Sequence, residues 1–169
     1  NLDWFREKIK SKYPVKFRGR MGPGDADDKS IRLLNRIITW DEEGIHWEGD
    51  QRHGEILVRE LGLLEDSRGA TTPAEKKTGQ DIGSIKANGQ DELIEGELGQ
   101  HPLDPSSTSK YRGMVARVNY LGQDRSDIAN TVKELSKDMC NPTDCSMQKI
   151  KRLGRYLKNQ PRFVLQFGY

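Results

Sequence analysis

The feature that most constrains how this chain folds is a long acidic interval without aromatic residues. No Phe, Trp or Tyr occurs between Glu48 and Lys110, and residues 64–107 carry nine acidic and four basic side chains. The few apolar residues of this interval show no sustained period, so they do not mark an element that buries one face. We therefore expect a folded segment over 1–63, an acidic flexible linker over 64–107 and a second folded segment over 108–169.

Charge and composition narrow the class of protein. Hydrophobic residues make up 33% of the chain and charged residues 32%, which favours partial disorder or a polar partner. Residues 108–169 carry twelve basic and five acidic side chains, for a net charge of +7. This balance suggests a polyanion partner, most simply nucleic acid, and the alternative is an ordinary solvated helical surface.

The sequence also bears on the cell compartment. No stretch approaches the roughly 18 consecutive apolar residues of a membrane-spanning helix, so we expect no membrane partner. The two cysteines, Cys140 and Cys145, are too few for a disulfide scaffold and lack a second pair of metal ligands. We expect a reduced, intracellular protein, with the choice between cytoplasm and nucleus left open.

The first segment is expected to contain two helices. Apolar residues on one stripe predict a helix over 2–12. A second amphipathic pattern predicts a helix over 51–61, with Asp50 as its N-cap and Gly62 as its stop.

Between these helices we expect strands. Alternation predicts a short strand over 15–18, and a β-branched run predicts another over 31–40. A turn with Gly44 at positive φ would then join 31–40 to 45–47 as an antiparallel hairpin.

Three amphipathic patterns and one strand follow the linker. The fold class is therefore α+β: a small antiparallel hairpin or sheet with flanking helices, the linker, then a three-helix bundle with a terminal strand over 162–167. The expected inward positions are Tyr111, Met114, Val115, Val118 and Leu121 on the first helix, Ile128, Val132, Leu135 and Met139 on the second, and Met147, Ile150, Leu153 and Leu157 on the third.

Several short motifs occur in a fixed order in the second segment. They are Tyr-Arg-Gly-Met-Val-Ala-Arg-Val-Asn-Tyr-Leu at 111–121, Asp-Arg-Ser-Asp-Ile at 124–128, Asn-Pro-Thr at 141–143 and Arg-Tyr-Leu-Lys at 155–158. In this order they resemble the reverse transcriptase of copia-type retrotransposons, downstream of its polymerase motif. The resemblance continues upstream through Phe5, Phe17, Leu34-Asn35, Gly44-Ile45, Asp50-Gln51, Ile56-Leu57 and Thr72-Pro73. It covers nearly the whole chain outside about 74–103.

Three residues depart from the family pattern. Ser126 stands in place of Pro in the Arg-Pro-Asp motif, Asn35 in place of Gly, and Ala116 where thumb helices often have Gly. Asn tolerates left-handed backbone, so the turn at Asn35 can survive. Together the departures suggest a divergent or decaying copy.

The resemblance implies a parent Pol polyprotein with RNA-directed DNA polymerase activity and Mg²⁺ as cofactor. Reverse transcriptases hold two catalytic Asp on an aromatic-x-Asp-Asp hairpin between apolar strands. Here the single Asp-Asp pair, Asp27-Asp28, follows Gly22-Pro23-Gly24 and has Asp25 in the aromatic position, so we interpret it as an acidic surface loop. We expect no catalytic residue, metal ligand or cofactor in this chain. By family order the catalytic hairpin would precede Asn1.

The resemblance places residues 1–63 at the end of the palm and 108–169 in the thumb and connection. It implies that Leu34 and Asn35 lie at the primer grip, where backbone groups hold the primer end.

Spacing adds two candidate nucleic-acid-binding faces. Arg112, Ala116 and Tyr120 recur at i, i+4 and i+8, where a small residue between a cation and an aromatic suits a wide minor groove; the alternative is that Ala116 is simply a good helix former. Lys151, Arg155 and Lys158 suit phosphate contacts, and here the alternative is a solvated helix face.

We therefore predict a reverse transcriptase fragment that holds template–primer duplex and does not catalyse alone. Its partners would be an RNA/DNA duplex and the remainder of the Pol polyprotein. One alternative is a domesticated or decayed copy that acts as a nucleic-acid or protein-binding module. Another is a gene fragment without a selected role.

Overall fold

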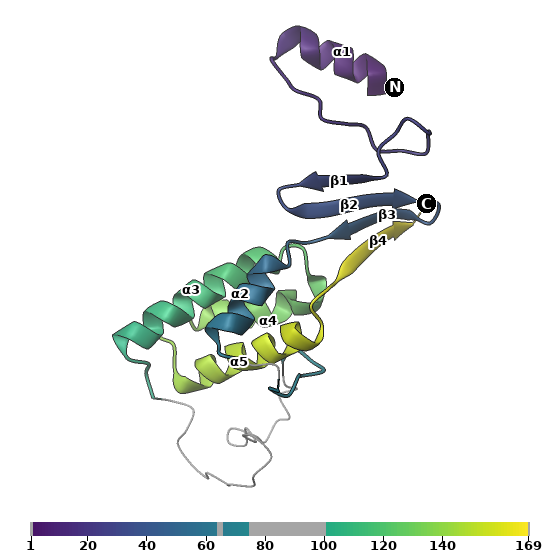
Figure 1. Cartoon of the computed structure of the whole chain (residues 1–169). Coiled ribbons are helices and arrows are strands. Elements are labelled where there is room, and N and C mark those ends of the chain that lie inside the picture. Colours follow the sequence, from purple (N-terminus) through teal and green to yellow (C-terminus); the bar gives the residue numbers. More distant parts are fainter. Residues whose placement is uncertain (1, 64–65, 75–100, 169) are drawn as a thin grey trace. The chain divides into compact units, whose positions relative to one another are not determined.

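The structure is a computed structural model that describes residues 2–63, 66–74 and 101–168 (Figure 1). It is α+β, as predicted, and divides into two compact units. One unit is Asn1–Trp47 with Leu165–Tyr169, and the other is Glu48–Val164. None of the described helices is long and apolar enough to cross a membrane.

The first unit contains a helix and most of a four-stranded sheet. Helix α1 (Leu2–Lys12) forms as predicted. The strands follow the order β1-β2-β3-β4 and are β1 (Ser30–Leu33), β2 (Arg36–Asp41), β3 (Gly44–Glu48) and β4 (Val164–Gly168). Residues 14–20 form no strand, so the strand predicted over 15–18 is wrong: alternation without a hydrogen-bonding partner strand does not make a ladder.

The run predicted as one strand over 31–40 is two strands joined by a tight turn. Leu34 and Asn35 both have positive φ, 50° and 63°, and β1 pairs antiparallel with β2 so that Leu33 faces Arg36. This is the pattern of a two-residue hairpin turn of type I′. The sequence signal was weak because Leu, unlike Asn, rarely adopts left-handed backbone.

The hairpin predicted around Gly44 is confirmed. Gly44 has φ of 144°, and an added Cβ would collide with the backbone carbonyl oxygen of Phe167 on β4. The site therefore requires glycine for its backbone angle and also for the close approach of β4.

The second unit is helical. Its helices are α2 (Arg52–Glu60), close to the predicted 51–61, and α3 (Pro105–Leu121), α4 (Ser126–Lys137) and α5 (Asp144–Asn159), which contain the predicted inward positions except Met139. Asp104 caps α3 through the backbone N–H groups of Ser106 and Ser107, and Thr143 forms a capping box with Ser146 on α5.

The start of α2 differs in one detail from the prediction. Gln51 is its N-cap, whereas the Asp50 carboxylate accepts a hydrogen bond from the Arg52 backbone N–H (3.1 Å). Gly62, with φ of 64°, ends this helix region as expected.

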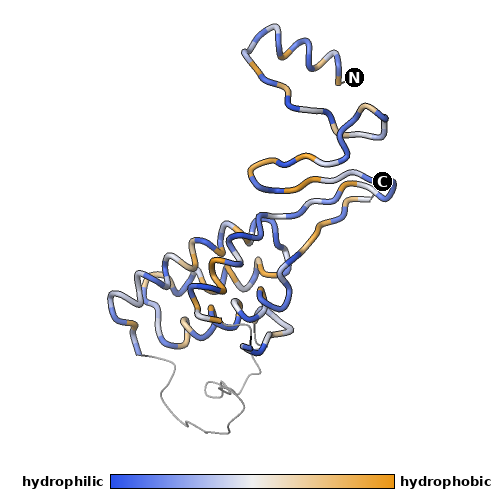
Figure 2. Tube along the Cα trace, in the orientation of Figure 1, coloured by the Kyte–Doolittle hydropathy of each residue, from blue (hydrophilic) through white to orange (hydrophobic). Residues whose placement is uncertain are grey.

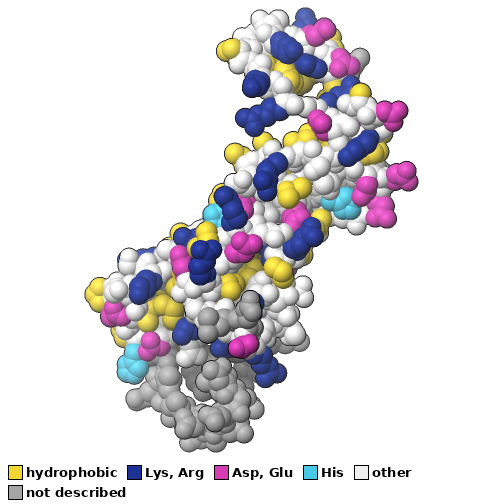
Figure 3. Space-filling model, in the orientation of Figure 1, with side chains coloured by type: hydrophobic (Ala, Val, Ile, Leu, Met, Phe, Trp, Pro, Cys, Tyr) yellow, Lys and Arg dark blue, Asp and Glu magenta, His cyan; other side chains and the backbone are white. Residues whose placement is uncertain are grey.

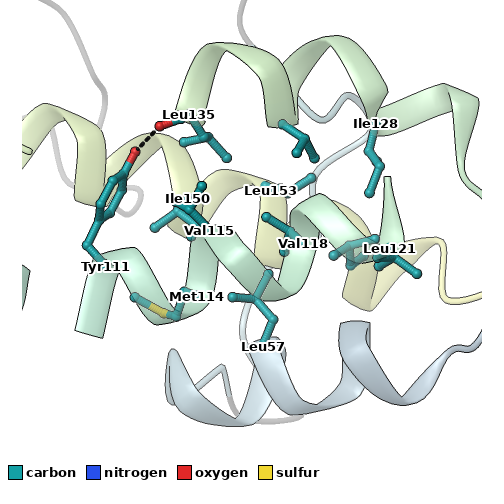
Figure 4. Close-up of a cluster of buried hydrophobic side chains, with 12 residues drawn as sticks. Leu57, Tyr111, Met114, Val115, Val118, Leu121, Ile128, Leu135, Ile150 and Leu153 are labelled. Atoms are coloured by element: carbon teal, nitrogen blue, oxygen red, sulfur yellow. Dashed lines mark hydrogen bonds between the residues drawn. The ribbon is translucent and has the colours of Figure 1, made fainter. Parts of the chain in front are cut away.

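The core lies among four helices, because α2 packs against both α3 and α5 (Figures 1 and 4). Leu57 of α2 is fully buried beside the predicted inward residues of the other three helices. Met139 and Met147 are only partly buried. The bundle thus begins at Glu48, and α2 groups with the second folded segment instead of the first. Its apolar stripe predicted that one face is buried but not which partner covers it.

Candidate nucleic-acid interface

The predicted face on α3 is exposed, but its cation already has partners. Arg112 donates from Nε to the Met139 carbonyl (2.8 Å) and from a terminal nitrogen to the Cys140 carbonyl (3.0 Å). These carbonyls follow the end of α4, where backbone acceptors lack helical donors. Arg112 therefore ties α3 to the end of α4.

The rest of this face is open and small. Ala116 is exposed, and a Cβ added at neighbouring Gly113 would meet no atom within 4 Å. Tyr120 is 37% exposed and its ring centroid lies 4.7 Å from that of His53 on α2. The face thus permits close approach of a ligand along α3 but offers little unengaged positive charge.

The predicted face on α5 carries more charge. Lys151 is exposed and Arg155 is half-buried. Lys158 donates to the Ser67 carbonyl (2.9 Å), and its neighbour Arg152 donates to the Thr72 hydroxyl (3.0 Å). Lys151 and Arg155 are therefore the members of this face best placed to meet an anion.

The contacts of Lys158 and Arg152 come from part of the predicted linker. Residues 66–74 lie along α5, and the Ala70 N–H donates to the Arg155 carbonyl (3.3 Å). Residues 75–100, the remainder of the predicted flexible interval before His101, lie outside the described residues. The linker prediction thus included a stretch that packs on a helix.

The two candidate faces lie on different sides of the bundle. Helices α2 and α4 each contact both α3 and α5, so α3 and α5 sit diagonally across the core (Figure 1). Each presents its outer face away from that core. The structure therefore does not bring Arg112, Ala116 and Tyr120 together with Lys151, Arg155 and Lys158.

The remaining predicted residues, Leu34 and Asn35, belong to the first unit. They form the tip of the β1–β2 hairpin, and Leu34 is 71% exposed there. Exposure at a hairpin tip leaves their backbone groups accessible to a ligand.

A buried ionic cluster explains two of the sequence motifs. The Arg125 and Asp127 side chains are 4% and 14% exposed and form an ion pair of 2.7 Å. Arg125 also donates to the carbonyls of Gln160 (2.9 Å) and Pro161 (3.3 Å). The Tyr156 hydroxyl donates to Asp127 (2.8 Å). The Tyr156 pKa is raised, mainly because the hydroxyl is buried and also because the Asp127 carboxylate lies beside it.

The motifs at 124–128 and 155–158 therefore meet as one structural element that fixes where the chain leaves α5. Ser126, which stands where the resembled motif has Pro, is the first residue of α4. Pro is favoured at that position because its missing N–H has no intrahelical partner, so Ser can replace it without breaking the helix. Sequence reasoning missed the cluster because the motif did not reveal that Arg125 is buried.

A second ion pair lies at the entry to the bundle. Arg162 donates to both Glu48 oxygens (2.9 and 2.8 Å), and the Glu48 side chain is 9% exposed. Gln51 also donates to this carboxylate. The hydrogen bonds from Arg162 hold the pKa of Glu48 below its usual value.

In the acidic loop at 25–28, the Asp27 carboxylate is bound by neighbouring groups of the same unit. Arg20 donates to Asp27 (2.8 Å) and lowers its pKa, and the Gly24 N–H donates to the same carboxylate (3.0 Å). Among residues 2–63, 66–74 and 101–168, no three His, Cys, Asp or Glu side chains group as metal ligands do. In this loop the Asp27 carboxylate is paired with Arg20.

Comparison with known proteins gives one relevant similarity. Over 53 residues, which are 31% of this chain, the sequence is 42% identical to the "Retrovirus-related Pol polyprotein from transposon RE1" of Arabidopsis thaliana. The match spans 4% of that polyprotein's length. No protein-family model and no solved structure matches the chain. The similarity supports a retrotransposon Pol origin.

Proposed function

We propose that this chain is the part of a copia-type reverse transcriptase that holds template–primer duplex, without carrying the polymerase active site. The ordered motifs and the similarity to a transposon Pol polyprotein support the family. The exposed Lys151 and the half-buried Arg155 on α5 are the observation that carries the binding role.

The bundle can use only one of its two candidate faces on a straight duplex. The α5 face is favoured because phosphates require positive charge, and the Arg112 guanidinium of the α3 face is occupied by carbonyls. Lys151 and Arg155 would contact the sugar–phosphate backbone, which gives binding without sequence preference. Residues 66–74 brace the same helix through Lys158.

Catalysis is assigned to another part of the parent polyprotein. The chain contains one Asp-Asp pair, and the Asp27 carboxylate of that pair accepts a hydrogen bond from Arg20. In this proposal the chain contributes grip on the duplex, and the two-metal chemistry belongs elsewhere.

The test measures binding of the full 169-residue chain to an RNA–DNA hybrid by fluorescence anisotropy at a range of salt concentrations. The Lys151→Gln/Arg155→Gln variant should bind more weakly, and its slope of log K against log salt should flatten by about 2. The charge-matched control Lys110→Gln/Lys133→Gln, which removes two exposed cations elsewhere, should change the slope far less.

A third variant separates the two faces. Ala116→Leu enlarges the exposed α3 face and should leave hybrid binding nearly unchanged. If Ala116→Leu weakens binding while Lys151→Gln/Arg155→Gln does not, the duplex sits on α3 and the α5 proposal is wrong. If the control variant matches the α5 variant, binding reflects net charge alone and the proposal also fails.

A further inference from the structure

The N-terminal segment concentrates positive charge, part of which is balanced because Arg20 pairs with Asp27 (2.8 Å) and Asp3 (3.7 Å). Residues 6–20 contain seven basic side chains and one acidic side chain, Glu7. The balanced charge of residues 1–63 as a whole hides this cluster, so a shorter window would have found it. Figure 3 shows Lys and Arg among hydrophobic side chains over α1 and the chain that follows it.

Aromatic side chains are exposed within the same segment. Trp4 is 60% exposed, Phe5 52% and Tyr13 63%, and α1 has no buried residue. Exposed aromatics at this density mark a surface that contacts a partner.

The aromatics and cations are interleaved and do not separate onto two faces. At 100° per residue Trp4 lies on a different side of α1 from the stripe of Leu2, Phe5 and Ile9, and Figure 2 shows hydrophobic and hydrophilic residues alternating along this helix. A helix that lies in a lipid interface needs its apolar residues on one face. This arrangement instead suits a ligand with alternating flat apolar groups and anions.

Within the protein itself, cations of α1 already contact an aromatic ring of the chain that follows this helix. Phe17 lies under two cations, with the Arg6 guanidinium 5.2 Å and the Lys10 amine 5.4 Å from its ring centroid. These contacts place Phe17 beside α1, while Tyr13, at the end of that helix, stays exposed.

We propose that residues 4–18 bind single-stranded nucleic acid, with phosphates against the cations and bases stacked on Trp4 and Tyr13. Base–aromatic stacking combined with a basic track is the usual physical basis of sequence-tolerant single-strand binding. This surface differs in residues and in ligand from the α5 face, and belongs to the other unit. A protein with both would have separate sites for duplex and for unpaired strand.

The experiment uses the full chain and a labelled oligo(dT) of about 16 nucleotides, compared with an abasic strand of equal length. The abasic strand keeps the phosphates and lacks the bases. Oligo(dT) should bind more tightly, and Trp4→Ala and Tyr13→Ala should each weaken its binding by roughly 5- to 100-fold while leaving abasic-strand binding unchanged. Phe167→Ala, which removes another exposed aromatic, serves as the control and should have no effect.

Three outcomes would overturn the proposal. Equal affinity for oligo(dT) and the abasic strand would show that the bases are not stacked. Unchanged binding in Trp4→Ala and Tyr13→Ala would show that the aromatics take no part. The third is that Trp4→Ala and Tyr13→Ala weaken binding to phosphatidylserine-containing vesicles and leave oligo(dT) binding unchanged, which would assign the surface to a membrane. The Lys151→Gln/Arg155→Gln variant should keep its oligo(dT) affinity, which separates this result from the test of the α5 face.

Discussion

Replacing Arg125 by Ala should destabilise the helical unit more than any exposed charge substitution. The Arg125 side chain is 4% exposed, and its loss leaves the Asp127 carboxylate, 14% exposed, without its cation. It also removes the donor to the carbonyls of Gln160 and Pro161. Removing one partner of a buried ion pair costs about 3–5 kcal/mol, so we expect a loss of that size in the free energy of unfolding.

The measurement is urea denaturation at neutral pH, followed by circular dichroism at the helix band. Lys137→Ala is the matched control, because Lys137 and Glu134 form an ion pair of 2.6 Å at 59% and 42% exposure. Such a surface pair contributes less than about 1 kcal/mol. If Arg125→Ala costs no more than Lys137→Ala, the cluster does not stabilise the fold and our reading of the two motifs is wrong.

Three further changes test other parts of the structure. Gly44→Ala should disrupt the β3–β4 pairing, seen as lost amide protection in hydrogen exchange; retained protection would contradict the close backbone approach. Tyr111→Phe should cost about 1–2 kcal/mol in denaturation, because the Leu135 carbonyl loses its buried donor; no loss would argue against that hydrogen bond. Arg162 lowers the Glu48 pKa in the folded state, so the ionised Glu48 stabilises the fold above the usual Glu pKa, and this stabilisation is lost as the pH falls from there through the lowered pKa. Glu48→Gln should therefore make the free energy of unfolding less sensitive to acid, and an unchanged pH profile would refute this.

The bundle core was the most predictable part of the fold. The inward stripes of α3, α4 and α5 follow the helical period, and nearly all of those residues are buried. The position of α2 was not predictable, because an amphipathic stripe does not identify the helix that covers it. The turn at Leu34 was missed because the left-handed angle of Leu is set by the pairing of β1 with β2.

The candidate site was predictable in exposure but not in partners. Spacing correctly placed Ala116 and Lys151 on exposed positions of their helices. It did not reveal that Arg112 binds carbonyls 27 and 28 residues away or that Lys158 binds one 91 residues away. Such contacts depend on tertiary packing, and local spacing carries no information about it.

The central claim, that α5 faces the duplex, is tested most directly by lysine footprinting. The full chain is acetylated briefly with and without an RNA–DNA hybrid, and the modification of each lysine is read by mass spectrometry. We predict that the hybrid protects Lys151 and leaves the exposed Lys133 of α4 modified at its original rate. Unchanged modification of Lys151, or equal protection of Lys133, would contradict the claim.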